Sequence, residues 1–133
     1  MESETRVGYF LDTKIMPVMA QWITALGLET WKIDVTVTRP FNGAWAVCWC
    51  SPEEKLGRIA FSDQLLDKVY DDQLLYIVGH ELIHMLVEPA MQVVEASVPD
   101  AILAGFREQM EGVVNRTTAI VGRAYKITPF AVP

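Results

Sequence analysis

Residues 71–88 read DDQLLYIVGHELIHMLVE, and this stretch is the strongest structural signal in the chain. Its apolar residues recur with a helical period, which predicts a helix that begins near Asp71 and Asp72. Pro89 should end this helix, because proline lacks the backbone N–H that a helix interior needs. At the centre of the helix stands the run His80-Glu81-Leu82-Ile83-His84. Positions i and i+4 lie one turn apart on the same face, so the two imidazoles can converge on one metal ion.

The sequence before this helix predicts another helix and three strands. Residues 13–28 have apolar positions at a helical spacing, and Pro17 is tolerated there only in the first turn. Alternating apolar and polar residues, interrupted by turn residues, then predict strands at residues 31–37, 44–50 and 55–62. Because the connections between these strands are short, we expect an antiparallel meander.

The sequence after the histidine helix predicts one more helix. A start that resembles a capping box at Ser97 leads into a helical pattern that continues towards Gly122 or Tyr125. The expected fold is therefore α+β: an N-terminal helix, a three-stranded mostly antiparallel sheet, the histidine helix and a C-terminal helix. A length of 133 residues suits a single domain over residues 1–133. All four tryptophans are expected in the core: Trp22, Trp31, Trp45 and Trp49.

Composition and charge argue against several classes of protein. The chain is 51% hydrophobic and 21% charged, as globular domains are, and its net charge of −6 argues against a nucleic-acid binder. The acidic N-terminus MESETR is unlike a signal peptide, and no stretch of about 20 apolar residues predicts a membrane span. Two cysteines are too few for a disulfide framework. We therefore expect a cytoplasmic protein that binds neither nucleic acid nor a membrane.

The chemistry expected of the histidine helix is that of zinc. His80 and His84 are the only histidines in the sequence, and imidazole nitrogen is a preferred ligand of Zn²⁺. A catalytic zinc has three protein ligands and leaves one position for water, whose pKa falls to about 7. Glu81 borders the same helix face, close enough to take a proton from that water without being a ligand. The pattern predicts a hydrolase that uses one zinc ion to cleave a peptide bond of a peptide or protein substrate.

A third zinc ligand has to come from outside the histidine run. Glu111 is the preferred candidate, because its apolar helical neighbours should pack inward. Gly112 beside it costs about 1 kcal/mol of helix stability relative to alanine, which a close approach to the histidine helix would compensate. The other candidates are two acidic residues and two cysteines: Glu95, Glu108, Cys48 and Cys50.

The histidine run, followed by a helix with Glu111 and Asn115, resembles the gluzincin branch of the zincin metallopeptidases. The likeness is greatest to ImmA/IrrE-type proteases and minigluzincins, and it covers residues 78–84 and 111–119 closely. It departs from their pattern at Val114 and Thr117, where those proteins have alanine and phenylalanine.

This resemblance implies a minimal zincin-like fold with a defined site. His80, His84 and Glu111 would hold the zinc ion, and Glu81 would be the general base. The strand before the histidine helix, residues 57–62, would be an edge strand that pairs with an extended substrate through main-chain hydrogen bonds.

Two other functions stay open at this point. Peptide deformylases also have a cysteine ahead of an HExxH helix, which would make Cys50 the third ligand of an amide hydrolase, although Ile83 departs from the HExDH of that family. In a strand, Cys48 and Cys50 share one face and are typical of small core residues. The small size of the chain also suits a non-catalytic interaction domain that zinc stabilises. Four residues are candidates for stabilising an oxyanion: Tyr70, Tyr76, Arg123 and Tyr125.

Overall fold

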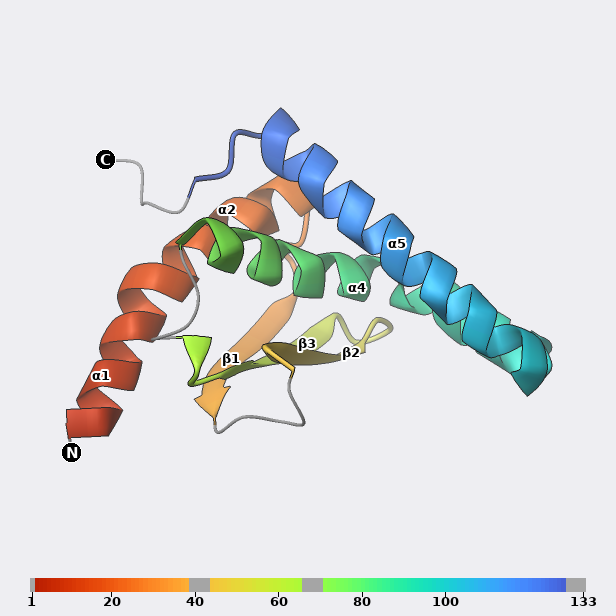
Figure 1. Cartoon of the computed structure of the whole chain (residues 1–133), viewed down its shortest axis with the longest axis horizontal. Coiled ribbons are helices and arrows are strands. Elements are labelled where there is room, and N and C mark those ends of the chain that lie inside the picture. The colour runs from red at the N-terminus through yellow and green to blue at the C-terminus, as the bar shows by residue number, and fades with distance from the viewer. Residues whose placement is uncertain (1, 39–43, 66–70, 129–133) are drawn as a thin grey trace.

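A computed structural model describes residues 2–38, 44–65 and 71–128 (Figure 1). The long helix that carries both histidines lies between the sheet and the last helix. This is an α+β domain, as the sequence predicts. In chain order its elements are α1 (Glu2–Phe10), η1 (Leu11–Ile15), α2 (Met16–Leu26), β1 (Lys32–Thr38), β2 (Ala46–Ser51), β3 (Leu56–Ser62), α4 (Asp71–Ser97) and α5 (Asp100–Ala124).

The first helical segment begins earlier than predicted. α1, η1 and α2 follow one another directly, so the helix is formed from Glu2 and not from about residue 13. η1 is a π-helical turn, in which the Met16 N–H donates a hydrogen bond to the Leu11 carbonyl. It ends at Ile15, two residues before Pro17, which has no N–H to donate to the preceding turn. The wider turn lets the helix pass through this proline.

The sheet is mixed, and its strand order is β1-β3-β2. β3 runs parallel to β1, with Gly57 opposite Ile33, and antiparallel to β2, with Ile59 opposite Cys48. The predicted meander is therefore wrong. The prediction that residues 57–62 form an edge is also wrong, because β3 is the central strand of the described sheet. Alternation of residue types specifies a strand but not its neighbours, which depend on tertiary packing.

The core lies between one face of the sheet and helices α2 and α4. Gly57 of β3 allows α4 to approach closely, since a Cβ built there would lie 2.8 Å from Sδ of Met85. Trp22 of α2 is fully buried, and its indole N–H donates to the Leu75 carbonyl of α4 over 3.0 Å. Gly79 of α4 lies against the Trp22 ring, with no room for a side chain. These close contacts fix the position of α4, the helix that carries His80 and His84.

α4 continues past Pro89, so the predicted end of this helix is wrong. A proline in a helix interior removes one backbone hydrogen bond and costs about 3 kcal/mol. Beyond the proline, α4 packs against the first turns of α5 as a helical hairpin, and Glu95 forms an ion pair with Arg107. Packing against a partner helix compensates the cost of the proline.

Ser97 does not start the last helix. Its hydroxyl donates to the Val93 carbonyl over 2.8 Å, within α4. α5 begins at Asp100, after Pro99, and ends at Ala124, close to the predicted end. Ser97 therefore belongs to the end of one helix and does not cap the next.

Two of the tryptophans lie outside the core. Trp22 is buried and Trp31 is half-buried, whereas Trp45 and Trp49 are 38% and 59% exposed. Trp49 alternates with the half-buried, inward-facing residues of β2, so it lies on the outer face of an edge strand, and Trp45 directly precedes this strand. In the described part of the chain, no helix is long and apolar enough to cross a membrane. The cytoplasmic location stays a prediction.

Candidate metal centre

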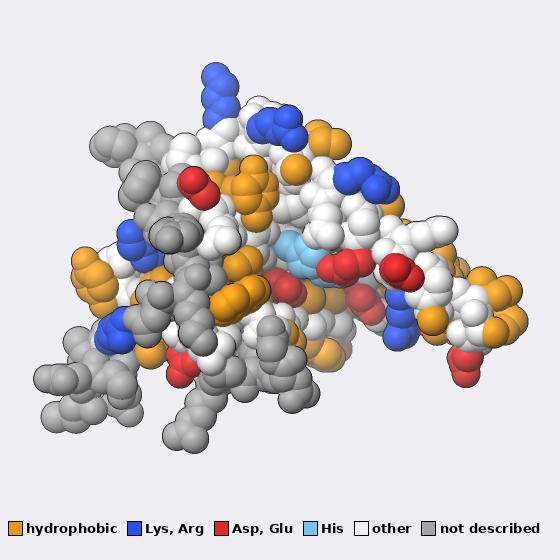
Figure 2. All heavy atoms as spheres, viewed as in Figure 1, with side chains coloured by type: hydrophobic (Ala, Val, Ile, Leu, Met, Phe, Trp, Pro, Cys, Tyr) orange, Lys and Arg blue, Asp and Glu red, His pale blue; other side chains and the backbone are white. Residues whose placement is uncertain are grey.

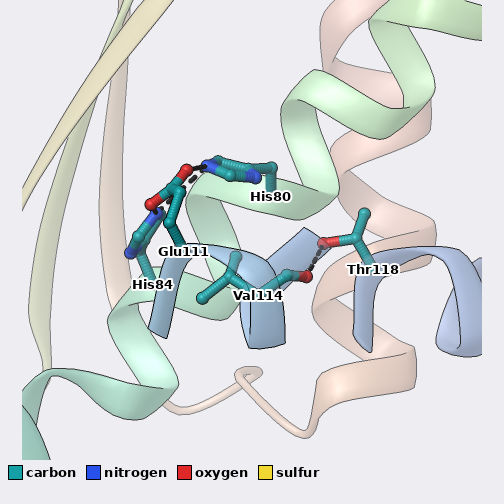
Figure 3. Close-up of polar contacts among 5 residues, drawn as sticks. All are labelled: His80, His84, Glu111, Val114 and Thr118. Carbon is teal, nitrogen blue, oxygen red and sulfur yellow. Dashed lines mark hydrogen bonds and ion pairs between the residues drawn. The ribbon is translucent and has the colours of Figure 1, made fainter. Parts of the chain in front are cut away.

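Three side chains of metal-ligand type meet between α4 and α5 (Figure 3). Glu111 places one carboxylate oxygen 2.7 Å from Nε2 of His80 and the other 3.1 Å from Nε2 of His84. The two Nε2 atoms are 3.0 Å apart. One ligand atom from each residue lies within 4.8 Å of the others. The fold therefore brings together the three residues that the sequence predicts as ligands.

This arrangement fits one divalent metal ion. Ligands on a tetrahedral zinc, at bond lengths near 2.0 to 2.1 Å, are about 3.3 Å apart, close to the separations seen here. Burial lowers the pKa of His84, which favours the neutral imidazole that a metal requires. Two nitrogens and one carboxylate oxygen are a donor set that zinc commonly takes in catalytic sites.

α4 directs both histidines away from the core, because the opposite side of the helix is buried. Val78, Leu82 and Met85 are fully buried. His80 and His84 retain 22% and 30% of their side-chain exposure. The apolar periodicity of α4 thus determines where the imidazoles point.

α5 is oriented in the same way by two buried residues. Val114 and Thr118 lie in the interior, and the Thr118 hydroxyl donates to the Val114 carbonyl over 2.7 Å. Glu111 lies one turn before Val114, on the side of α5 that faces the histidines (Figure 3). Burial of Val114 and Thr118 therefore presents the Glu111 carboxylate to α4.

Glu81 is the buried carboxylate of the site, with only 9% of its surface exposed. Burial raises its pKa, while a hydrogen bond from the Cys48 thiol and the nearby His80 lower it. Burial also raises the pKa of the Cys48 thiol far above its ordinary value, so that thiol stays neutral and can donate. A carboxylate whose pKa is raised accepts a proton more readily near neutral pH.

A pocket of about 300 Å³ opens beside these residues. Its lining includes His80 and Glu81 of the centre, Asn115 of α5 and Tyr76 one turn before His80. Trp45 and Ala46, at the start of β2, form its other side. A structural zinc site is closed, whereas a catalytic site needs space for a substrate next to the metal. The pocket provides such space directly beside His80.

The other candidate ligands do not join this cluster. Glu95 is paired with Arg107, and Glu108 lines a separate surface hollow on α5. Within the described residues, the group that can hold a metal contains neither cysteine, so the deformylase-like ligand set with Cys50 is not formed. The contact of Cys48 with Glu81 was missed from the sequence, although the alternation of β2 places Cys48 on the inner face.

The oxyanion candidates are scattered. Tyr76 lines the pocket next to His80, and Arg123 lines a neighbouring pocket. Tyr125 is 63% exposed and contributes to neither of these two pockets. Tyr70 lies outside the described residues.

Comparison with family models identifies the class of protein. The model of peptidase family M48 matches residues 12–131, which is nearly the whole chain. The chain belongs to peptidase family M48. A search of curated proteins and a search of solved structures gave no match.

M48 peptidases are metal-dependent. This agrees with the cluster of His80, His84 and Glu111 between α4 and α5, which could hold a metal ion. The closer likeness to ImmA/IrrE-type proteases and minigluzincins is not tested by this match and stays a prediction.

The Cys48 thiol should matter to this M48 chain through its hydrogen bond to Glu81. We expect Cys48→Ala to lower kcat roughly tenfold, because Glu81 would lose the donor that fixes its orientation, and a hydrogen bond to a charged group is worth about 1.5 to 3 kcal/mol. Cys48→Ser keeps a donor and should restore most of kcat. Steady-state kinetics on one peptide would measure both, with Cys50→Ala as the matched control on the same strand face. Equal kcat values for the wild type and Cys48→Ala would refute this role.

Proposed function

We propose that this M48 chain is a zinc-dependent peptidase in which His80, His84 and Glu111 hold one zinc ion and Glu81 is the general base. The observation that carries the proposal is that the three ligand atoms converge beside a pocket. The mostly buried carboxylate of Glu81 also lines this pocket. When bound, zinc acts as a Lewis acid that makes water acidic near neutral pH and polarises a carbonyl.

Glu81 performs the proton transfers in this proposal. Its carboxylate accepts a proton from the attacking water and passes it to the nitrogen of the leaving amine. Its burial favours proton uptake, and the thiol of Cys48 fixes its orientation. The protein thus supplies a base that is held in place and mostly shielded from solvent.

The substrate in this proposal is a peptide or protein segment that pairs with β2. β2 is an edge of the described sheet, and its beginning lines the pocket at Trp45 and Ala46. An edge strand offers unpaired N–H and C=O groups to an extended peptide. In this proposal β2 takes the role that the family resemblance implies for residues 57–62.

Metal analysis tests the ligand set directly. Wild-type protein, purified without added chelator and dialysed, should contain one zinc ion per chain by elemental analysis. Glu111→Ala should weaken zinc binding by more than about 100-fold, because even the loss of a residue that merely supports a ligand costs 10- to 100-fold. Glu108→Ala is the matched control on α5 and should bind zinc as the wild type does.

Activity against a peptide library separates the peptidase from the alternative function. Zinc-dependent cleavage that a chelator stops and added zinc restores supports the peptidase. Bound zinc without cleavage of any peptide would favour the zinc-stabilised interaction domain. A wild-type protein that binds no zinc would overturn the proposal.

A further inference from the structure

A second pocket adjoins the metal centre, toward the N-terminal end of α4. Its volume is about 390 Å³, and Tyr76 lines both this pocket and the one beside His80. The rest of its lining includes Asp72 of α4, Arg123 at the end of α5, and Lys126 just beyond α5. We call it the cationic pocket.

The cationic pocket carries a positive charge in an acidic protein. Two of its described lining residues are basic, Arg123 and Lys126, and one is acidic, Asp72. The whole chain, by contrast, has a net charge of −6. Neither Arg123 nor Lys126 forms an ion pair with a described residue. A planar guanidinium with parallel N–H donors, next to an ammonium group, suits a carboxylate.

The backbone at Lys126 gives an independent indication of function. Lys126 has a φ of 51°, in the left-handed region. Its N–H donates to the Arg123 carbonyl, and the Ile127 N–H donates to the Gly122 carbonyl over 3.0 Å. This is a Schellman motif, in which the left-handed position is usually glycine. A lysine that occupies such a position at a free-energy cost suggests that its side chain is needed there.

The direction of β2 indicates which part of a substrate reaches this pocket. β2 runs beside α4 in the same direction (Figure 1): Ala46 at its start lines the pocket together with His80, Cys48 in its middle donates to Glu81, and the charge of Glu88 acts on Cys50 near its end. Antiparallel pairs of strands are the commoner kind. A peptide antiparallel to β2 runs from the Glu88 end towards the cationic pocket, so its C-terminal part arrives there.

Charge along this path agrees with that direction. Figure 2 shows mainly acidic side chains next to the histidines on the side of the α4–α5 hairpin, where Arg107 is paired with Glu95, and basic side chains toward the C-terminal end of α5. A peptide has its free amine at one end and its free carboxylate at the other. The antiparallel direction places each terminal charge near charges of opposite sign.

The length of α4 between His80 and the far end of the cationic pocket, at Asp72, determines how many substrate residues lie between the cleaved bond and this pocket. Asp72 lies two turns before His80, which is about 12 Å along a helix. An extended peptide covers that distance in about three or four residues.

We propose that the cationic pocket binds a carboxylate of the substrate about three or four residues on the C-terminal side of the cleaved bond. That carboxylate is either the C-terminus of a short peptide or the side chain of an aspartate or glutamate. The inference rests on the proposed peptidase function and adds the substrate class: peptides that are acidic on the C-terminal side of the cut.

Binding measurements test the pocket without relying on turnover. The cleavage site of a library peptide is first mapped with the wild type by mass spectrometry. Fluorescent peptides are then bound to the zinc-loaded Glu81→Gln variant and followed by anisotropy. One pair ends four residues after the cleaved bond, with a free carboxylate or with an amide. A second, longer pair is amidated and has glutamate or glutamine at that position.

We expect at least one carboxylate peptide to bind about tenfold more tightly than its neutral counterpart. A preference in the first pair alone identifies a terminal carboxylate, and a preference in the second pair identifies a side chain. Adding Arg123→Gln and Lys126→Gly should abolish the preference, whereas adding Arg116→Gln, elsewhere on α5, should not. Lys126→Gly alone should weaken the preference and raise the unfolding midpoint by roughly 4 °C, because glycine relieves the left-handed position.

Two results would overturn the inference, and they are distinguishable. Cleavage and zinc binding with equal affinity for charged and neutral peptides would reject the carboxylate site and leave the peptidase proposal intact. Absence of zinc and of cleavage would reject the peptidase proposal, and the inference with it.

Discussion

A Glu81→Gln variant should keep its zinc and lose about 10²- to 10⁴-fold in kcat, the range that a general base contributes. Glutamine has nearly the same shape as glutamate and can still accept the hydrogen bond from Cys48, but it cannot take up a proton from water. The loss should therefore fall on kcat, with little change in substrate binding. Steady-state kinetics on a defined peptide, together with elemental analysis for zinc, would measure both quantities.

Glu88→Gln is the matched control for this experiment. Glu88 is half-buried on the same helix and influences His84 electrostatically, but it is not part of the metal-ligand cluster. Its replacement removes a charge near the site without removing the base, so kcat should stay within a few-fold of wild type. A Glu81→Gln variant with wild-type kcat would eliminate the proposed mechanism.

A Gly79→Ala variant should be strongly destabilised. The added Cβ would overlap the Trp22 ring, which is fully buried and hydrogen-bonded to the Leu75 carbonyl. Overpacking of this kind costs about 1 to 3 kcal/mol and sometimes more, or several degrees in the unfolding midpoint. Because Gly79 directly precedes His80, zinc affinity should fall as well. Urea unfolding of the metal-free protein isolates the packing effect.

Gly105→Ala provides a control of opposite sign. A Cβ built on Gly105 of α5 has no neighbour within 4 Å. Alanine should therefore stabilise this helix by about 0.5 to 1 kcal/mol relative to glycine. If Gly79→Ala were as stable as Gly105→Ala, the contact between α2 and α4 would not be the constraint described here.

The pairing of the two histidines in the candidate metal centre was predictable because it depends on local geometry. Spacing along one helix determines that His80 and His84 share a face, and this requires no knowledge of the rest of the fold. Glu111 comes from a different helix, so its approach to the histidines depends on tertiary structure. The sequence indicated it only through the need for a third ligand and through apolar neighbours such as Val114.

The sheet order was not predictable from the same signals. The spans of the three strands were close to those observed, but the parallel pairing of β1 with β3 is not encoded in their alternation. It depends on long-range packing, including the close approach of Met85 to Gly57. The hydrogen bond from Cys48 to Glu81 was missed for the same reason, because it joins β2 to α4 across the core.

Pro89, Trp45 and Trp49 show that residue type alone can mislead. Proline is unfavourable in a helix, yet packing of α4 against α5 outweighs its cost. Large aromatic residues are usually buried, yet Trp49 faces outward on the edge strand β2, and Trp45, directly before β2, is 38% exposed. Trp45 lines the pocket beside the candidate metal ligands, so this exception falls next to the site.

The position of the three candidate ligands along the chain has a consequence for stability. His84 and Glu111 bracket the far part of α4 and the first half of α5, so an ion held by both acts as a cross-link that closes a loop of about 27 residues. By the relation used for disulfide cross-links, such closure removes roughly 3.5 kcal/mol of chain entropy from the unfolded state. The same ion that would take part in catalysis would therefore also stabilise the packing of α5 against α4.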